Sequence, residues 1–177
     1  ETRDLENHVI VAGFGRVGKT ICKLLNAENI KNYIVLDSNP KVVHEARRDG
    51  FPIYYGSAER LDILKSVGID RASMIAVTIS NKKSIKHVVQ TIHKAYPDLS
   101  LVVRAWDRNH ADELREEGAT VAMAEAFESS LMLGGAILQA KGIEPQELKR
   151  ILTVFRSEEY PVSLKQLLTA EGVDTGS

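Results

Sequence analysis

Short apolar runs alternate with segments of helical period along most of this 177-residue chain. Each run is rich in β-branched or aromatic residues, as is typical of buried strands. The expected strands are Val9–Ala12, Tyr33–Leu36, Phe51–Tyr55, Ser73–Thr78, Leu99–Arg104 and Thr120–Met123. Strands separated by helices form βαβ units with right-handed crossovers, which make the strands parallel. The chain is therefore expected to be an α/β protein with a doubly wound, parallel, Rossmann-like sheet.

The segments between these runs carry apolar residues at helical spacing. Helices are expected around Val17–Leu25, from Pro40, around Leu61–Lys65, around Ile85–Ile92, and from a cap at Asp107 to Gly118. Together with the strands, they account for residues 8–124, which we assign to one Rossmann-like domain. Residues 1–7 are a polar linker without an initiator Met, so we expect the chain to be part of a longer protein.

The pattern changes after Met123. The helix expected over 126–140 is apolar around much of its circumference and needs cover on more than one side. Its apolar residues are Phe127, Leu131, Met132, Leu133, Ala136, Ile137 and Leu138. We favour a subunit interface for this helix. A closing helix begins at Pro145, and for it intrachain packing and an interface stay equally open. We assign 125–158 to these two helices and 159–177 to a polar tail.

Composition excludes several classes of function. Lys plus Arg number 23 against 24 Asp plus Glu, a formal charge of −1, whereas nucleic-acid binding favours a basic excess. The single cysteine, Cys22, excludes an intrachain disulfide and fits a reducing compartment. No apolar run approaches the roughly 18 residues of a membrane span, and no Cys/His cluster indicates a metal.

A glycine-rich segment between the first strand and the first helix fits two phosphate-binding motifs. Gly13, Gly15 and Gly18 form G-x-G-x-x-G, the dinucleotide fingerprint. Gly13 and Gly18, followed by Lys19 and Thr20, form the G-x-x-x-x-G-K-[ST] loop of NTPases. Both place phosphate at a helix N-terminus, where free N–H groups and the helix dipole favour anions.

Asp37, at the end of the second expected strand, favours the dinucleotide interpretation. The dinucleotide motif expects an acid about 20 residues after the glycines, at the end of the second strand, to bind ribose hydroxyls. Of the two motifs, only this one gives Gly15 a role. An acid also repels a 2′-phosphate, which favours adenosine, AMP or NAD over NADP. Two alternatives remain: Asp37 caps the helix before Pro40, or the glycine turn holds no ligand.

Nothing in the sequence indicates a catalytic residue. No tyrosine has a lysine four residues on, and no paired carboxylates suggest an acid/base couple. Of the five histidines, His87 and His93 lie on a helix and are expected to be solvated. His110 lies near the end of a strand, beside Arg108, and is expected to be a surface residue. A nucleotide-binding sensor is favoured over the alternative of a small reductase or P-loop-type NTPase.

Four segments carry a resemblance to a known family. They are Val9–Gly18, Val35–Asp37, Tyr54–Ala58 and Leu101–Ala105, the last followed by Asp107. From His8 to Phe155 the chain resembles the RCK-N domains, also called KTN or TrkA-N, of potassium channels and transporters. Within that family it is most similar to the cytosolic domains of Kef-type glutathione-gated potassium-efflux antiporters. The helix over 125–140 resembles the family's crossover helix, which packs on a partner subunit.

The resemblance implies a regulatory homodimer formed through 126–140. It would be the cytoplasmic domain of an inner-membrane potassium/proton antiporter whose membrane part lies outside this chain. AMP or NAD(H) is the implied ligand, and glutathione or a conjugate a possible regulatory one. The implied ligand-binding residues are Gly13, Phe14, Gly15, Arg16, Val17, Gly18, Asp37, Ser38, Gly56, Ser57, Ala58, Thr78 and Arg104. The family usually has an acid where Ser57 stands, and often a smaller or charged residue where Trp106 stands.

Overall fold

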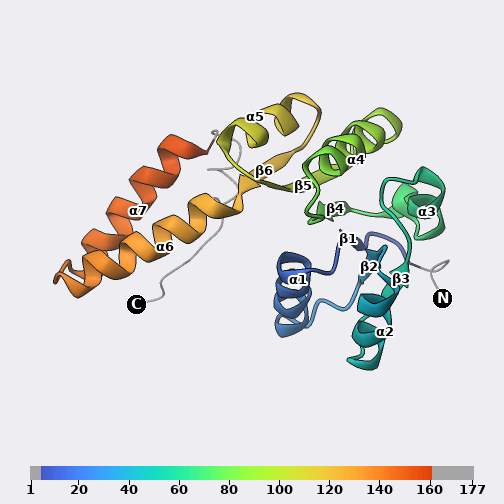
Figure 1. Ribbon diagram of the computed structural model, residues 1–177, viewed down its shortest axis with the longest axis horizontal. Helices are drawn as coiled ribbons and strands as arrows, with labels where there is room; N and C mark the ends of the chain where they lie inside the picture. The colour runs from blue at the N-terminus through green and yellow to red at the C-terminus, as the bar shows by residue number, and fades with distance from the viewer. Residues whose placement is uncertain (1–4, 161–177) are drawn as a thin grey trace.

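A computed structural model describes residues 5–160, which form a six-stranded parallel sheet with helices on both faces (Figure 1). The strand order is β3-β2-β1-β4-β5-β6. The strands are β1 (Val9–Ala12), β2 (Tyr33–Asp37), β3 (Ile53–Tyr55), β4 (Met74–Val77), β5 (Ser100–Ala105) and β6 (Val121–Ala124). The expected doubly wound sheet is confirmed, with each predicted strand in place.

Seven α-helices and a 3-10 helix connect and extend this sheet in the described residues. They are α1 (Arg16–Ala27), α2 (Pro40–Arg48), α3 (Leu61–Ser66), η1 (Ile69–Arg71), α4 (Lys82–Ala95), α5 (Arg108–Glu116), α6 (Glu125–Ala140) and α7 (Pro145–Glu159). The short helix η1 was not predicted. Three residues at 3-10 geometry are too few to leave a periodic apolar pattern. Among the helices of residues 5–160, none is both long and apolar enough to cross a bilayer.

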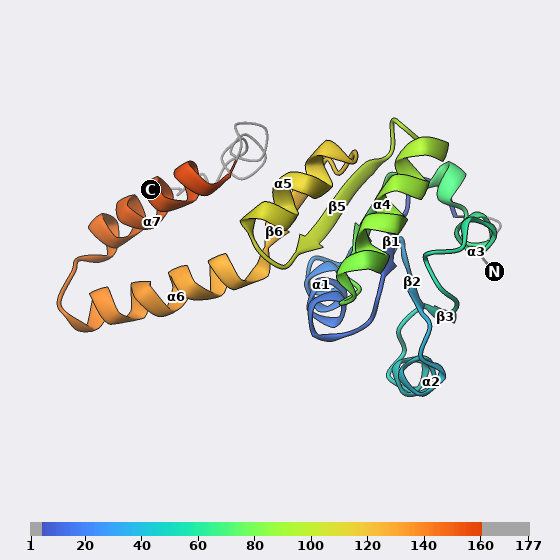
Figure 2. The same cartoon turned by 45° about the horizontal axis from the view of Figure 1, so that its top comes forward.

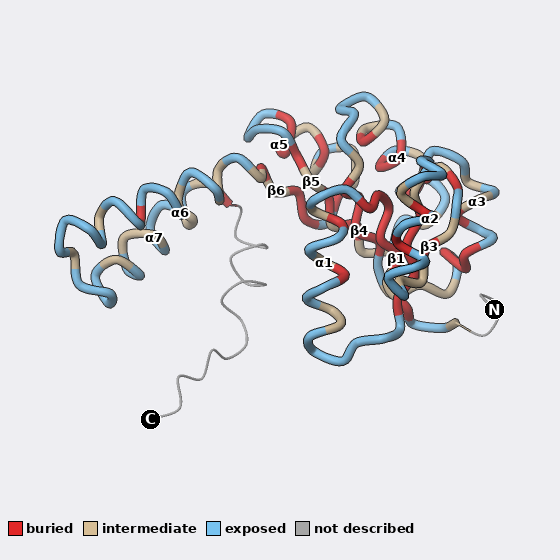
Figure 3. Tube along the Cα trace, turned by 60° about the horizontal axis from the view of Figure 1, so that its bottom comes forward, coloured by how far each residue is buried: buried red, intermediate tan, exposed pale blue. Residues whose placement is uncertain are grey.

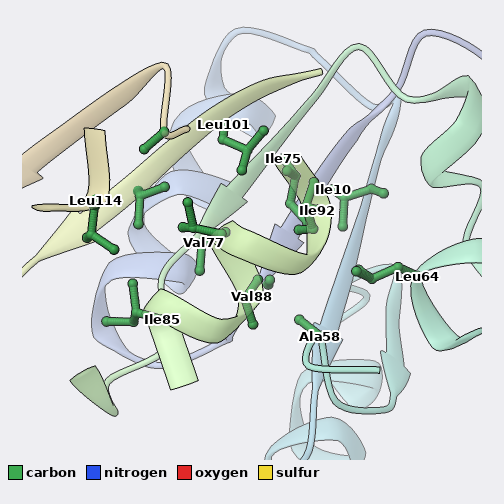
Figure 4. Close-up of a cluster of buried hydrophobic side chains, with 14 of the residues drawn as sticks. Ile10, Ala58, Leu64, Ile75, Val77, Ile85, Val88, Ile92, Leu101 and Leu114 are labelled. Carbon is green, nitrogen blue, oxygen red and sulfur yellow. The ribbon is translucent and has the colours of Figure 1, made fainter. Parts of the chain in front are cut away.

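Alternate residues of the central strands supply two separate cores. Ile10 and Ile34 join the larger core, which α3, α4 and α5 cover (Figure 4). Val11 and Val35 point to the opposite face and pack against α1 and α2. This arrangement follows from the period of two in a strand, because neighbouring side chains leave opposite faces of the sheet. Not every apolar residue of α1 joins this core, since Leu24 is 63% exposed.

Helices α6 and α7 form an antiparallel hairpin that extends away from the sheet (Figure 2). Leu148 and Leu152 of α7 lie against Gly135 of α6. Of the two alternatives for α7, intrachain packing therefore holds for this face of the helix. Most of the remaining surface of the hairpin is exposed or half-buried (Figure 3).

The end of α7 packs against the sheet domain, and the helix ends later than the predicted boundary at 158. The helix continues to Glu159, one residue past the expected end at 158, and Tyr160 is buried against Val121 and Phe127. Burial raises the pKa of the Tyr160 phenol, and its hydroxyl donates a hydrogen bond of 2.7 Å to Glu128. The rest of the expected tail, 161–177, lies outside the described residues.

Candidate functional site

A pocket lies at the carboxyl ends of the strands, where the strand order reverses. Strand β1 pairs with β2 on one side and with β4 on the other. Because the connections on the two sides run to opposite faces, a crevice opens between the β1 and β4 ends. A pocket of about 450 Å³ occupies this position. The ligand site of a doubly wound sheet is expected at this place.

The turn between β1 and α1 depends on two glycines. Gly13 has φ +107°, which L side chains rarely adopt, and its N–H donates to the Leu36 carbonyl at 2.7 Å. A Cβ at Gly18 would lie 1.9 Å from the Gly13 carbonyl oxygen, so the first turn of α1 presses directly on the loop. A Cβ at Gly15, by contrast, meets no heavy atom of the described chain within 4 Å. The loop is therefore tightly packed behind Gly13 and open beside Gly15.

The N-terminus of α1 lacks the side-chain cap that α2, α4 and α5 have. Helices α2, α4 and α5 are capped by the side chains of Asn39, Asn81 and Asp107. The cap of α1 is Gly15, and no side chain within residues 5–160 bonds the N–H groups of this helix end. Unpaired N–H groups and the positive end of the helix dipole suit a phosphate. The first turn of α1 thus fits an anionic group of a ligand.

Asp37 links the end of β2 to the glycine loop. Its Oδ2 accepts a hydrogen bond of 2.8 Å from the backbone N–H of Phe14, and its Oδ1 accepts one of 2.8 Å from Asn39 N–H. The cap of α2 is Asn39, whose side chain accepts from two backbone N–H groups, so Asp37 is not the helix cap. Each carboxylate oxygen keeps a second lone pair. The carboxylate therefore lines the pocket in a fixed position and has lone pairs left for further hydrogen-bond donors.

Thr78 fixes the opposite side of the glycine loop. It follows β4 and is 6% exposed. Its Oγ1 lies 3.1 Å from the Ala12 carbonyl oxygen and 2.9 Å from that of Gly13, so the hydroxyl can donate to either. This contact ties the end of β4 to the end of β1. Thr78 therefore shapes the pocket by holding the loop as well as by lining it.

Most of the predicted ligand-binding residues meet in this pocket. Those that line it are Gly13, Gly15, Arg16, Asp37, Ser38, Gly56, Ser57, Ala58, Thr78 and Arg104. Three others lie behind it. Phe14 buries its ring against Phe51, with ring centroids 4.9 Å apart. Val17 is half-buried on α1, and Gly18 packs against the turn.

Sequence reasoning missed several lining residues. They are Leu36, Asn39, Val42, Glu59, Ile79, Ser80, Asn81 and Ser84. The stretch 79–81 directly follows β4, the partner of β1 at the crevice. Ligands of doubly wound sheets bind beyond the carboxyl ends of the strands, at the place where the strand order reverses. This rule identifies residues 79–81 once the order of the strands is known.

Lys19 and Thr20, which an NTPase loop would direct at phosphates and Mg²⁺, are placed elsewhere. Neither is among the residues that line the pocket. The Thr20 hydroxyl donates to the Arg16 carbonyl at 2.9 Å, within its own helix. The geometry therefore supports the dinucleotide motif and not the overlapping NTPase motif.

His110 is buried, so its prediction as a surface residue was wrong. It is 1% exposed, and its Nδ1 accepts a hydrogen bond of 3.1 Å from the Trp106 N–H. Desolvation, followed by the charge of Lys82, lowers the pKa of His110. The indole of Trp106 in turn donates to the Ser80 carbonyl at 2.9 Å. These contacts join the loop after β4 to the turn after β5, beside the pocket.

Comparison with known proteins gives consistent matches. The TrkA-N domain family matches residues 9–125. A glutathione-regulated potassium-efflux system protein of Haemophilus influenzae is 34% identical over 154 residues, covering 87% of this chain and 25% of the relative. The chloroplastic K(+) efflux antiporter 3 of Arabidopsis thaliana is 31% identical over 180 residues, covering 98% of this chain and 23% of the relative. The chain spans about a quarter of the length of these relatives.

A solved structure matches both the sequence and the fold. The Kef CTD of Shewanella denitrificans in its AMP-bound form has a TM-score of 0.75 and 31% sequence identity. The match covers 86% of this chain and 92% of that chain. The similarity therefore extends through nearly the whole of that domain.

Proposed function

The chain belongs to the TrkA-N domain family, and from this premise we propose that it is the nucleotide-binding regulatory domain of a potassium-efflux antiporter. One observation carries the proposal. The uncapped N-terminus of α1 and the carboxylate of Asp37 line the same pocket. The first suits a phosphate and the second suits ribose hydroxyls. A nucleotide places these two groups side by side.

The proposed ligand is an adenine nucleotide without a 2′-phosphate, either AMP or NAD(H). Its phosphate lies at the first turn of α1 and its ribose on Asp37, with the base beside the turn at 56–58. The AMP-bound state of the Shewanella domain supports AMP as the first candidate. The pocket continues past Thr78 to Arg104, which leaves room for a second group such as the nicotinamide half of NAD(H).

AMP is expected to stabilise the domain. At about one hundred times its Kd, a ligand stabilises a folded protein by about 2.7 kcal/mol. For a domain of this size, this raises the Tm by roughly 5–10 °C. Differential scanning fluorimetry with AMP, NAD and NADH measures the shift. NADP is the control, because its 2′-phosphate meets the Asp37 carboxylate and should give a smaller shift. No shift with any adenine nucleotide would contradict the proposed function.

We also propose that the domain works as a homodimer through α6. The exposed side of this helix carries Met132, Leu133 and Ile137, which are 64%, 70% and 64% exposed. Leu131 and Phe155 line an apolar groove of about 310 Å³ between α6 and α7. Apolar side chains gathered on a protruding hairpin are typical of an interaction surface. In the antiporter, ligand binding at this dimer would gate cation transport on the cytoplasmic side, with glutathione or a conjugate as a second regulatory ligand.

Leu133→Asp is expected to separate the dimer into monomers. The leucine is largely exposed within one chain, so aspartate there should leave the monomer fold intact while placing a charge in the apolar interface. Sedimentation velocity should show half the wild-type mass. Leu131 is a poorer probe, because it also packs in the groove between the two helices. Lys23→Asp, on the exposed surface of α1, is the control and should keep the wild-type mass. An unchanged mass for Leu133→Asp would contradict the α6 interface.

A further inference from the structure

Two arginines that line the nucleotide pocket share one carboxylate that lies outside it. The Nε of Arg104 is 2.8 Å from Oε2 of Glu125. The guanidinium of Arg16 bonds the other oxygen, Oε1, of the same carboxylate. Both arginines line the pocket, and Glu125 is not among its lining residues. In the ligand-free protein, this single carboxylate therefore pairs with both arginines that line the pocket, and the three side chains keep one net positive charge.

The three residues connect the pocket to the hairpin. Arg16 is the first residue of α1, Arg104 lies in β5, and Glu125 is the first residue of α6. The side chains of Arg104 and Glu125 are 22% and 31% exposed, whereas that of Arg16 is 77% exposed. Arg104 and Glu125 are thus partly shielded from solvent, and Arg16 is free to reorient. The shared carboxylate joins the proposed phosphate site to the start of the helix that leaves the sheet.

We propose that Glu125 is a built-in competitor for the ligand's phosphate. Resting on the proposed function, the inference is that a bound phosphate draws Arg16 and Arg104 away from the Glu125 carboxylate. Binding would then release the first turn of α6 from the sheet domain. The same contact that lowers nucleotide affinity would carry the binding signal to the hairpin.

Elementary electrostatics make this exchange feasible in both directions. A phosphate carries more charge and more acceptor oxygens than one carboxylate, so it forms stronger charge-assisted hydrogen bonds with arginine. Glu125, once released, still lies in the first turn of α6, where the positive end of the helix dipole stabilises an acidic side chain. Neither state leaves a charge without a favourable partner. The exchange requires an anionic ligand, because a neutral nucleoside offers the arginines nothing in place of the carboxylate.

Glu125→Gln tests the competition, because it keeps the side-chain shape and removes the charge. Isothermal titration calorimetry measures the affinities for adenosine, AMP and ADP, three ligands of increasing negative charge. Exposed or partly exposed ion pairs contribute about 0.2–1 kcal/mol each, so loss of two should raise AMP affinity about two- to thirtyfold. ADP should gain at least as much as AMP. Adenosine should bind wild type and variant equally.

Controls separate this competition from a general charge effect. Glu147→Gln removes one negative charge from an exposed ion pair with Arg150 on α7 and should leave every affinity unchanged. In an Arg104→Gln background, the gain from Glu125→Gln should shrink, because one of the two released partners is already missing. Melting curves without ligand establish that each variant is folded.

A second readout follows the helix itself. Because coupling between two sites is reciprocal, AMP should increase hydrogen exchange in the first turn of α6 in the wild type. In Glu125→Gln, this exchange should already be raised without ligand. Equal AMP affinity in wild type and Glu125→Gln, or an equal gain for adenosine and AMP, would overturn the competition while leaving the proposed function standing. Absence of AMP binding in both proteins would overturn both.

Discussion

Gly18→Ala is expected to melt about 6–12 °C below the wild type and to lose nucleotide binding. The added Cβ would lie 1.9 Å from the Gly13 carbonyl oxygen and 2.9 Å from the Thr78 Oγ1. The nearest contact is with backbone, so no side-chain rotation relieves it. Overpacking of this kind costs about 3 kcal/mol, which corresponds to that fall in Tm for a domain of this size. Thermal denaturation monitored by circular dichroism measures the change.

Gly15→Ala is the matched variant for Gly18→Ala, because it changes the same loop without a clash. Gly15 has φ −74° and ψ −161°, an extended conformation that alanine adopts freely. Its Cβ would meet no heavy atom of residues 5–160 within 4 Å. The variant should therefore melt like the wild type and still lose AMP affinity, since the methyl group enters the space proposed for the phosphate. Wild-type AMP affinity in Gly15→Ala would contradict the proposed pose, and a wild-type Tm in Gly18→Ala would contradict the close packing.

Asp37→Ala is expected to weaken AMP binding about 10- to 100-fold. A hydrogen bond to a charged group contributes about 1.5–3 kcal/mol, and the variant removes the acceptor proposed for the ribose hydroxyls. It also removes the acceptor of the Phe14 N–H, so we expect a loss of about 1–3 kcal/mol in the free energy of unfolding. Titration calorimetry measures the first effect and chemical denaturation the second.

A ligand control separates the two roles of Asp37. 2′,3′-Dideoxy-AMP lacks the hydroxyls that the carboxylate is proposed to bind. Its affinity should therefore differ much less between wild type and Asp37→Ala than that of AMP. Asp37→Ala should also reduce the discrimination against NADP, because the repulsion of the 2′-phosphate is gone. An equal loss for AMP and its dideoxy analogue would assign Asp37 to holding the loop and not to binding ribose.

Much of the pocket was predictable because its parts follow strands directly. The glycines after β1 and Asp37 at the end of β2 occupy positions that the motif spacing defines. Parallel strands bring their carboxyl ends to one edge, so residues that follow them meet. The lining residues after β4 were not identified, because the neighbour of β1 across the crevice depends on the order of strands in the sheet.

The burial of two side chains, His110 and Tyr160, was harder to predict. His110 has the sequence context of a solvated helix start, yet it is buried beneath the turn that Trp106 begins. Tyr160 follows a polar segment, yet its ring packs on Phe127 with centroids 5.7 Å apart. In both cases, the side chain is buried by contacts that the periodicity of its own helix does not indicate. Periodicity indicates which face of a helix is apolar, but not which other segments pack against the residues at its ends.

The sequence by itself determined the parallel sheet, the glycine loop and the acid at the end of β2, because backbone period and motif spacing are local properties of the chain. Only the tertiary structure decided that Arg16 and Glu125, 109 residues apart, share an ion pair with Arg104. That contact depends on where β5 and β6 lie relative to β1. The spacing of charged residues along the chain does not indicate their partners in long-range ion pairs. Those partners depend on which side chains lie close together after the strands have assembled.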